Sequence, residues 1–359
     1  MLGRKTLLII GAGAGADISM PMGGALATKI SEYLNLSPEI NWDWTEGEKS
    51  RDTGNNITRA AMQLLATGNP GGDINSYYVA GHQISQGLPG WSNSIDNYLN
   101  RHQDQPLVQQ CGKLAIAQII LESECECNLY VDLDAPHKLQ FRDTNVVRHS
   151  WFQSLWSILE TGIVKSKNLD SIFDRLSVVT FNYDRTFEHF LHVGLQQAFH
   201  ISPSDAAILL NSKLDIDHVY GRVADLPWQA DGRGYAFGRK PTPHDLAVLW
   251  NRITTFNEEI SDKQLLDKLA LKVGDAERII FLGCHFHEQN MKLLRAAATA
   301  SDQRDVVVYA TATARSSSAV EQIRKQIKES IRSYKLELQI GNWDCRNLFA
   351  EFDTTWAHT

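Results

Sequence analysis

Short apolar runs that end in small or polar residues recur along the chain and predict strands. Runs of this length, rich in Val, Ile and Leu, are typical of strands buried on both faces of a parallel sheet. The expected core strands are Leu7–Ile10, Leu176–Thr180, Arg278–Leu282, Val306–Ala310 and Leu336–Ile340. Between them, apolar residues recur at helical spacing. This predicts helices over Gly24–Leu34, Asp184–Ala198, His287–Ala298 and Ser318–Tyr334. The alternation predicts an α/β fold with a Rossmann-like, doubly wound, mainly parallel sheet, whose ligands bind beyond the carboxyl ends of the strands.

The stretch from Asn35 to Leu169 has a different, mostly helical pattern. Its expected helices are Ile57–Leu65, Ile95–Leu99, Pro106–Leu121 and Val146–Leu159. Glycine and proline in 69–72 and 87–90 predict turns between them. We therefore expect residues 35–169 to form a large helical insertion, packed over a Rossmann-like core of residues 1–34 and 170–345, within one domain of residues 1–359. Trp151 and Trp156 share a helix with leucines, so we expect both in the core.

The composition excludes several classes of protein. The 359 residues are 43% hydrophobic and 21% charged, as in ordinary globular proteins, and the net charge of −7 argues against a dedicated nucleic-acid binder. The basic stretch 324–335 is expected to be a solvated helix face. No run approaches the roughly 18 apolar residues of a membrane span. The chain enters a strand at once, without a signal-peptide cleavage site, and its five cysteines form no C-x-x-C pair. We expect a cytoplasmic protein with free thiols.

A glycine-rich turn follows the first predicted strand. Gly11 and Gly13 allow a tight turn and a close approach of a ligand to the backbone. The amides that follow, at the start of a helix, suit a pyrophosphate. The turn lacks the full G-x-G-x-x-G pattern and its acidic residue on a second strand, since Glu32 lies in a predicted helix. Taken alone, this signal is weak.

Two later segments end strands in polar residues. Asn182 and Asp184 follow the run ending at Thr180, where alternation places both on one face, and they can hold a water and a ribose hydroxyl. Asp184 could equally cap the helix that follows. His218 lies on the strand-like run Ile216–Val223, and its unperturbed pKa suits a base near neutral pH. A lone histidine is more often structural, but Gly221 nearby would allow close approach of a ligand.

Together these segments resemble the Sir2 superfamily, and more closely its bacterial Sir2-like NAD hydrolase branch in antiviral defence than the protein deacylases. The resemblance covers residues 5 to about 309 but does not specify the insertion. Gly11 and Pro21 keep the ten-residue interval of the opening motif of the family. Its Thr-x-Asn-x-Asp, its later glycine strand end and a Ser-Ile-Asp-x-x-Leu segment of the branch are matched by Thr180, Asn182 and Asp184, by Gly283 with Cys284, and by Ser94–Leu99.

Three departures from the family pattern are visible. The His-Gly position of the deacylases holds Tyr220 before Gly221, with His218 two residues upstream. Two residues along a strand return to the same face, so His218 is expected to reach the site, although either residue could occupy the catalytic position. The four-cysteine zinc ribbon is missing, and Met22-Gly-Gly24 replaces Asp-Phe-Arg. The last two departures argue against acyl-lysine deacylation.

The resemblance implies an NAD+ glycohydrolase that releases nicotinamide and ADP-ribose, with NAD+ as substrate and no metal. It implies that Asn182 positions water or a ribose hydroxyl and that His218 is the base. The implied NAD-binding residues are Gly11, Ala12 and Gly13 at the pyrophosphate, Asp184 on the ribose side, and Asp17, Pro21, Gly283 and Cys284.

Uncontrolled NAD+ destruction would kill the host, so the resemblance also implies a regulated effector of bacterial antiphage defence. Regulation would come from homo-oligomerisation or from a partner protein of a defence operon, without direct nucleic-acid or membrane binding. One alternative is a non-catalytic NAD or ADP-ribose sensor or scaffold, which the displaced histidine favours. Another is a metal-dependent hydrolase built on His285, His287 and Glu288.

Overall fold

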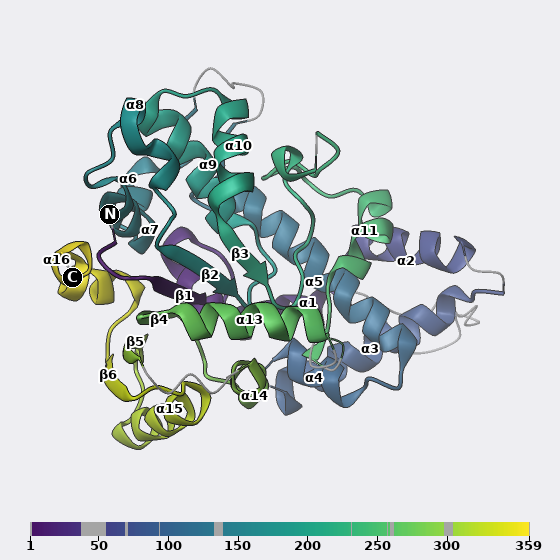
Figure 1. Ribbon diagram of the computed structural model, residues 1–359. Coiled ribbons are helices and arrows are strands. Elements are labelled where there is room, and N and C mark those ends of the chain that lie inside the picture. The colour runs from purple at the N-terminus through teal and green to yellow at the C-terminus, as the bar shows by residue number, and fades with distance from the viewer. Residues whose placement is uncertain are drawn as a thin grey trace, which may run out of the picture.

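A single parallel sheet forms the centre of the molecule. The computed structural model describes residues 2–36, 55–68, 71–92, 94–132, 139–230, 232–256, 258, 262–297 and 304–358. Within these residues, six strands pair in the order β3-β2-β1-β4-β5-β6, all parallel (Figure 1). Their bounds are β1 (Thr6–Ile10), β2 (Leu176–Thr180), β3 (Asp215–His218), β4 (Arg278–Leu282), β5 (Asp305–Thr311) and β6 (Lys335–Gly341). This is the strand order of a Rossmann-type sheet, and the predicted α/β class is confirmed.

The register of the central strands brings their carboxyl ends level with one another. Ile10 lies opposite Thr180 of β2 and Leu282 of β4. The residues that follow these strands therefore meet at one edge of the sheet. All five core strands predicted from the sequence are present, with ends within one residue of the expected ones. The run Ile216–Val223 differs, because its strand ends at His218 and a turn follows.

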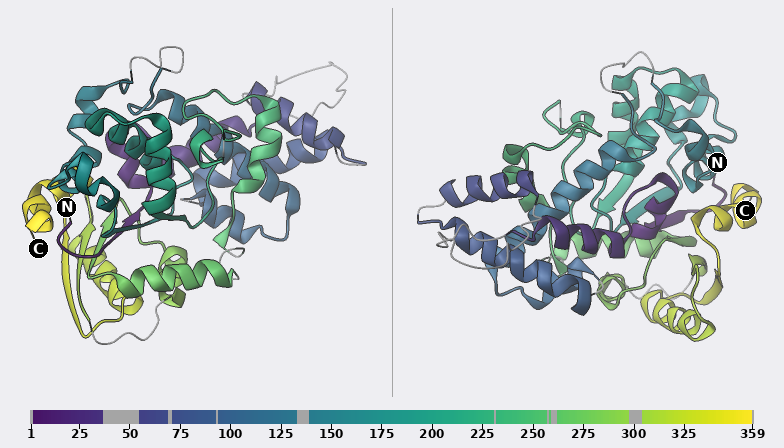
Figure 2. Two further views of the ribbon diagram at one scale, coloured as in Figure 1. Left: turned by 45° about the horizontal axis from the view of Figure 1, so that its top comes forward. Right: turned by 180° about the vertical axis from the view of Figure 1, so that it is seen from behind.

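Helices cover both faces of the sheet, which explains why β1 and β4 are buried along their whole length. One face carries α7 (Trp151–Glu160), α9 (Thr186–Phe199) and α16 (Cys345–His358), and the other carries α13 (Lys263–Asp275), α14 (Glu288–Ala297) and α15 (Ser317–Ser330) (Figure 2). Trp151 is fully buried between α9 and α16, where its ring lies 6.1 Å from that of Phe187 and 6.0 Å from that of Phe349. Trp156 is also buried, so both tryptophans belong to the core as expected.

The stretch 35–169 divides into two groups of helices. The group α2 (Asn56–Gly68), α3 (Ile74–Trp91), α4 (Ile95–Arg101) and α5 (Pro106–Glu126) packs with α1 (Gly23–Tyr33) and α11 (Pro243–Leu249), on the right of Figure 1. The other group, α6 (Thr144–Arg148), α7 and α8 (Lys165–Asn168), lies with α9 and α10 (Pro203–Lys213) over the sheet. The first group reaches the carboxyl edge of the sheet and can wall a binding site there.

Several local predictions need correction. Residues 87–90 were expected as a turn but lie inside α3. A Cβ at Gly87 would come 2.5 Å from the Tyr98 ring, so this glycine allows α3 to pack closely on α4. The helix expected over Val146–Leu159 is broken into α6 and α7, with Ser150 preceding α7. The helix expected to reach Tyr334 ends at Ser330, so the basic stretch 324–335 is only partly helical. Asn69 and Pro70 of the other expected turn lie outside the described residues.

The described helices include none that is long and apolar enough to cross a membrane. All five cysteines are free thiols; Cys284 is partly exposed and the other four are buried.

Candidate functional site

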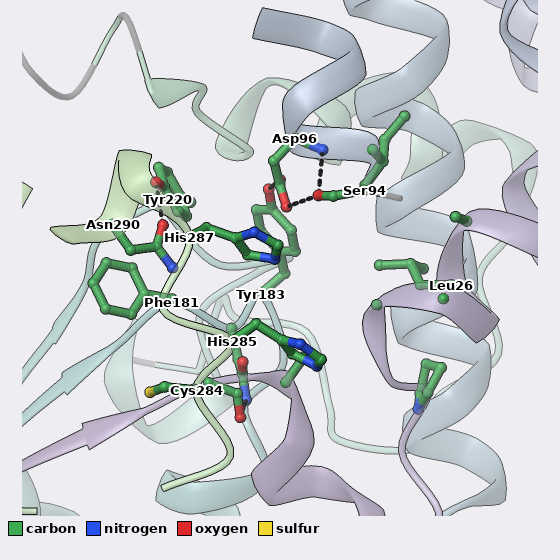
Figure 3. A pocket seen from close by; sticks show the side chains of 18 of the residues that line it. Leu26, Ser94, Asp96, Phe181, Tyr183, Tyr220, Cys284, His285, His287 and Asn290 are labelled. Carbon is green, nitrogen blue, oxygen red and sulfur yellow. Dashed lines mark hydrogen bonds between the residues drawn. The ribbon is translucent and has the colours of Figure 1, made fainter. Parts of the chain in front are cut away.

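A cavity of about 680 Å³ opens at the carboxyl edge of the sheet. The loops that follow β1 to β5 form part of its wall, and α1, α3, α4 and α5 form the rest (Figure 3). Six of the residues singled out from the sequence line this cavity: Gly11, Ala12, Pro21, Asn182, Asp184 and Cys284. Lining residues that were not assigned to the NAD site from the sequence include Asp96, Tyr183, His285, His287, Asn290 and Arg315.

The glycines of the opening turn serve contact between two loops. A Cβ at Gly11 or Gly13 would lie 2.8 or 2.9 Å from the carbonyl oxygen of Gly283. Gly283 has a φ of 60°, and a Cβ there would lie 2.0 Å from the backbone nitrogen of Ala14. Gly11 N–H donates to Leu282 O at 2.9 Å, and Gly13 N–H donates to Gly283 O at 3.0 Å. Two of the three amides expected to hold a pyrophosphate are therefore already hydrogen-bonded within the protein.

Asn182 and Asp184 lie where β2 ends. The side-chain Nδ2 of Asn182 donates to Gly11 O at 3.3 Å, and this hydrogen bond links the ends of β1 and β2. The Oδ1 of Asn182 makes no hydrogen bond to the described residues. Asp184 is buried, and its Oδ1 accepts hydrogen bonds from the backbone N–H, at 3.1 Å, and the hydroxyl of Thr186. Burial raises the pKa of Asp184, although these hydrogen bonds oppose the shift. Asp184 thus binds the start of α9 and also lines the cavity, so the two sequence-based alternatives are compatible.

The expectation that His218 reaches this cavity needs correction. His218 lies in a small space behind Asn182 and Asp184. Its Nε2 is 2.8 Å from Glu188 Oε1, and its Nδ1 is 3.1 Å from the backbone oxygen of Asn182. Both neighbours are hydrogen-bond acceptors, so both ring nitrogens are engaged by protein groups outside the main cavity. The strand ends at His218, so strand alternation does not carry its direction on to Tyr220.

Glu188 is the carboxylate that holds His218. Its side chain is buried in α9, and burial alone would raise its pKa. The charge and hydrogen bond of His218, together with the charge of Arg222, instead lower the pKa of Glu188 to about 2. The carboxylate is therefore ionised at neutral pH and keeps His218 turned away from the cavity.

Tyr220 is the member of the His-x-Tyr-Gly segment that faces the cavity. Its hydroxyl donates to Asn290 Oδ1 at 2.7 Å, and the residue is buried beside Phe181 (Figure 3). Gly221 has a φ of 69°, and a Cβ there would lie 2.0 Å from the carbonyl oxygen of Arg252. The glycine thus permits close backbone packing with the 252–254 segment, and the turn directs Tyr220 inward.

A carboxylate from α4, that of Asp96, also lines the cavity. Ser94 is the N-cap of α4, and its Oγ accepts from the backbone N–H of Asp96 at 3.2 Å. The Asp96 carboxylate accepts hydrogen bonds from Ser94 Oγ and from the hydroxyl of Tyr183 (Figure 3). Burial, followed by the charge of Asp96, raises the pKa of Tyr183 well above its usual value. The Ser94–Leu99 match pointed to this segment, but only the tertiary contact with Tyr183 shows that Asp96 belongs to the site.

The segment between β4 and α14 brings two histidines to the cavity. His285 Nδ1 lies 2.7 Å from Arg315 Nη2, and the rings of His285 and His287 are stacked 5.7 Å apart. Burial and the positive charge of Arg315 lower the pKa of both histidines. His287 adds to the shift of His285, and the charge of Asp96 opposes the shift of His287. Glu288 is the third residue of the metal-site alternative, and its carboxylate lies 3.7 Å from the guanidinium of Arg295. Among the described residues, no three His, Cys, Asp or Glu side chains lie close enough together to hold a metal ion.

The remaining predicted residues support the site without lining it. Asp17 accepts a hydrogen bond from the backbone N–H of Trp151 at 3.2 Å, and burial raises its pKa. Gly13 and Gly283 form the loop contact described above.

The chain matches no protein-family model and no curated protein with which it was compared. Its resemblance to Sir2-like proteins therefore rests on the sequence motifs alone.

Proposed function

We propose that the protein is an NAD+ glycohydrolase, which cleaves the nicotinamide–ribose bond to release nicotinamide and ADP-ribose. The observation that carries this proposal is that the three motif segments, represented by Gly11, Asn182 and Tyr220, line one cavity. Its volume of about 680 Å³ lies within the range of about 300–1,000 Å³ typical of small-molecule sites. The cavity also lies beyond β1 and β4, where the strand order reverses and sheets of this type bind dinucleotides.

The polar groups of the cavity suit the chemistry of this bond. Cleavage passes through an oxocarbenium-like ribose and needs no acid, because nicotinamide leaves as a neutral molecule. Carboxylates stabilise the developing positive charge, and Asp96 and Asp184 both line the cavity. The unoccupied Oδ1 of Asn182 accepts a hydrogen bond from the attacking water or from a ribose hydroxyl.

A base is still needed to take the proton of the water. The raised pKa of Asp184 makes it a stronger base than an ordinary aspartate, and it lies beside Asn182 at the end of β2. His218 acts as a positioning residue, because it binds the Asn182 backbone oxygen and Glu188 on α9. In this scheme Asp184 replaces His218 as the proton acceptor.

The test is incubation of the purified protein with NAD+ in the presence of EDTA, followed by quantification of nicotinamide. We expect nicotinamide release by the wild type and a loss on the order of 10²-fold or more in Asn182→Ala, because a group that orients the reacting atoms is removed. Asn211→Ala is the matched control, because its Nδ2 also donates to a single backbone carbonyl, Trp228 O at 3.0 Å, but lies on α10 away from this cavity. Asn182→Ala activity within a few-fold of wild type would contradict the assignment.

A second candidate function is an NAD or ADP-ribose sensor that binds without turnover. The engagement of both ring nitrogens of His218 outside the cavity favours it, because the histidine expected to act as the base is then absent from the described lining. Binding of ADP-ribose by a wild-type protein that releases no nicotinamide would favour this sensor. The metal-dependent alternative would instead show activity that is lost with EDTA.

We further propose that the hydrolase is a regulated effector of antiphage defence, active as a homo-oligomer or with a partner protein. Its support is the resemblance to the Sir2-like defence branch and the toxicity of unrestrained NAD+ hydrolysis.

A further inference from the structure

The charges of the cavity wall are unbalanced for a dinucleotide. The diphosphate of NAD+ is a dianion, yet the described lining contains the carboxylates of Asp96 and Asp184 and a single lysine or arginine, Arg315. The amides of Gly11 and Gly13 are already hydrogen-bonded to the end of β4 and its loop. A phosphate in this cavity therefore depends on Arg315 for its charge partner.

Arg315 is free to bind an anion. It lies in the loop between β5 and α15, it is exposed, and it forms no ion pair with a carboxylate of the described residues. Its one hydrogen bond to a described side chain joins Nη2 to His285 Nδ1 at 2.7 Å. The guanidinium can only donate, so Nδ1 of a neutral His285 accepts and the ring proton lies on Nε2. Arg315 and the Nε2–H of His285 then offer adjacent donors at the cavity.

The backbone beside each member of the pair is held in an unfavourable conformation. Phe286, next to His285, has a φ of 54°, and Ala314, next to Arg315, has a φ of 55°. Residues with a Cβ rarely adopt this region, and such strain clusters at functional sites. Contacts with the loop after β6 hold the segment that carries Ala314 and Arg315 in place. Ala314 N–H donates to Asn342 Oδ1 at 2.7 Å, and Thr313 Oγ1 donates to Trp343 O at 2.7 Å.

We propose that Arg315 and His285 bind the diphosphate of the dinucleotide and thereby select dinucleotides over nucleosides. The identity of the ligand rests on the proposed function, whereas the anion-binding role rests on the charge and donor geometry of the pair. Arg315 supplies the charge, and His285 orients the guanidinium through Nδ1 and donates through Nε2.

The first arm of the test measures nicotinamide release from NAD+ and from nicotinamide riboside, which lacks the diphosphate. Loss of a charge-assisted hydrogen bond corresponds to about 10- to 100-fold in affinity. We therefore expect Arg315→Ala to raise KM for NAD+ about 10- to 100-fold with little change in kcat, and to leave the nicotinamide riboside reaction unchanged. Arg315→Lys should recover only part of the affinity, because an ammonium lacks the planar fork of the guanidinium. Lys325→Ala, which removes an exposed charge from α15, is the matched control.

The second arm measures binding of ADP-ribose and adenosine by calorimetry and needs no turnover. We expect Arg315→Ala and His285→Ala to weaken ADP-ribose binding while adenosine binding stays as in the wild type. This result in a protein that releases no nicotinamide would refute the hydrolase and retain the diphosphate site. A wild type that hydrolyses NAD+ but binds ADP-ribose no better than adenosine would overturn the diphosphate site alone. Equal losses for NAD+ and nicotinamide riboside in Arg315→Ala would overturn it as well.

Discussion

A buried ion pair fastens the helical group α2–α5 to the loop that carries Asp184. Glu124 on α5 and Arg185 are both completely buried. Arg185 donates to Glu124 Oε1 from its backbone N–H at 3.0 Å and from Nε at 3.1 Å, and its guanidinium also binds Oε2. Because Arg185 directly follows Asp184, the pair fixes α5 against this loop and also fixes the position of Asp184 in the cavity wall.

We predict a large loss of stability in Glu124→Gln. The substitution keeps the side-chain volume but leaves the Arg185 charge buried without a counterion, which costs about 3–5 kcal/mol. An unfolding entropy of about 2.1 cal/mol/K per residue gives about 0.75 kcal/mol/K for the 359 residues. The expected fall in melting temperature is therefore about 4–7 °C.

The measurement is thermal unfolding followed by circular dichroism, with Asp275→Asn as the control. Asp275 also forms an ion pair, with Lys5 at 2.8 Å, but the two side chains are 68% and 55% exposed. An exposed pair contributes about 0–1 kcal/mol, so this control should melt within about 1 °C of the wild type. A melting temperature of Glu124→Gln that differs from the wild type by no more than that of Asp275→Asn would refute the reasoning. The Arg185 charge would then have found another partner or reached water.

Two further predictions concern the site loops and assembly. Gly283→Ala should destabilise the protein by more than about 2 kcal/mol, because its φ of 60° disfavours a side chain and the new Cβ would lie 2.0 Å from Ala14 N. Gly24→Ala, where a Cβ meets no atom within 4 Å, should unfold at the same urea concentration as the wild type or at a slightly higher one, and equal midpoints for both variants would contradict the loop contact. Light scattering across a dilution series, run beside the nicotinamide assay, should show an oligomer whose specific rate falls as it dissociates. A monomer hydrolysing NAD+ at full rate at every concentration would rule out regulation by assembly or by a partner.

The sequence alone determined the strands and the polar or glycine residues that follow their carboxyl ends. Buried parallel strands are continuous apolar runs, and this signal is local, so β1, β2, β4, β5 and β6 were found with nearly correct ends. Residues that end such strands must lie at the carboxyl edge of the sheet. For this reason Gly11, Asn182 and Asp184 could be placed at this edge from the sequence, and all three line the same cavity.

Tertiary structure decided which side chains face the cavity and what they contact. Asp96 meets Tyr183 across 87 residues of chain, and Arg315 meets His285 across 30, and no local pattern encodes either contact. The direction of His218 depends on Glu188 in helix α9 and on a strand that ends at His218, directly before the turn that contains Tyr220. Strand periodicity holds only while the strand continues, so the sequence could place a histidine near the site but could not tell which way its ring points.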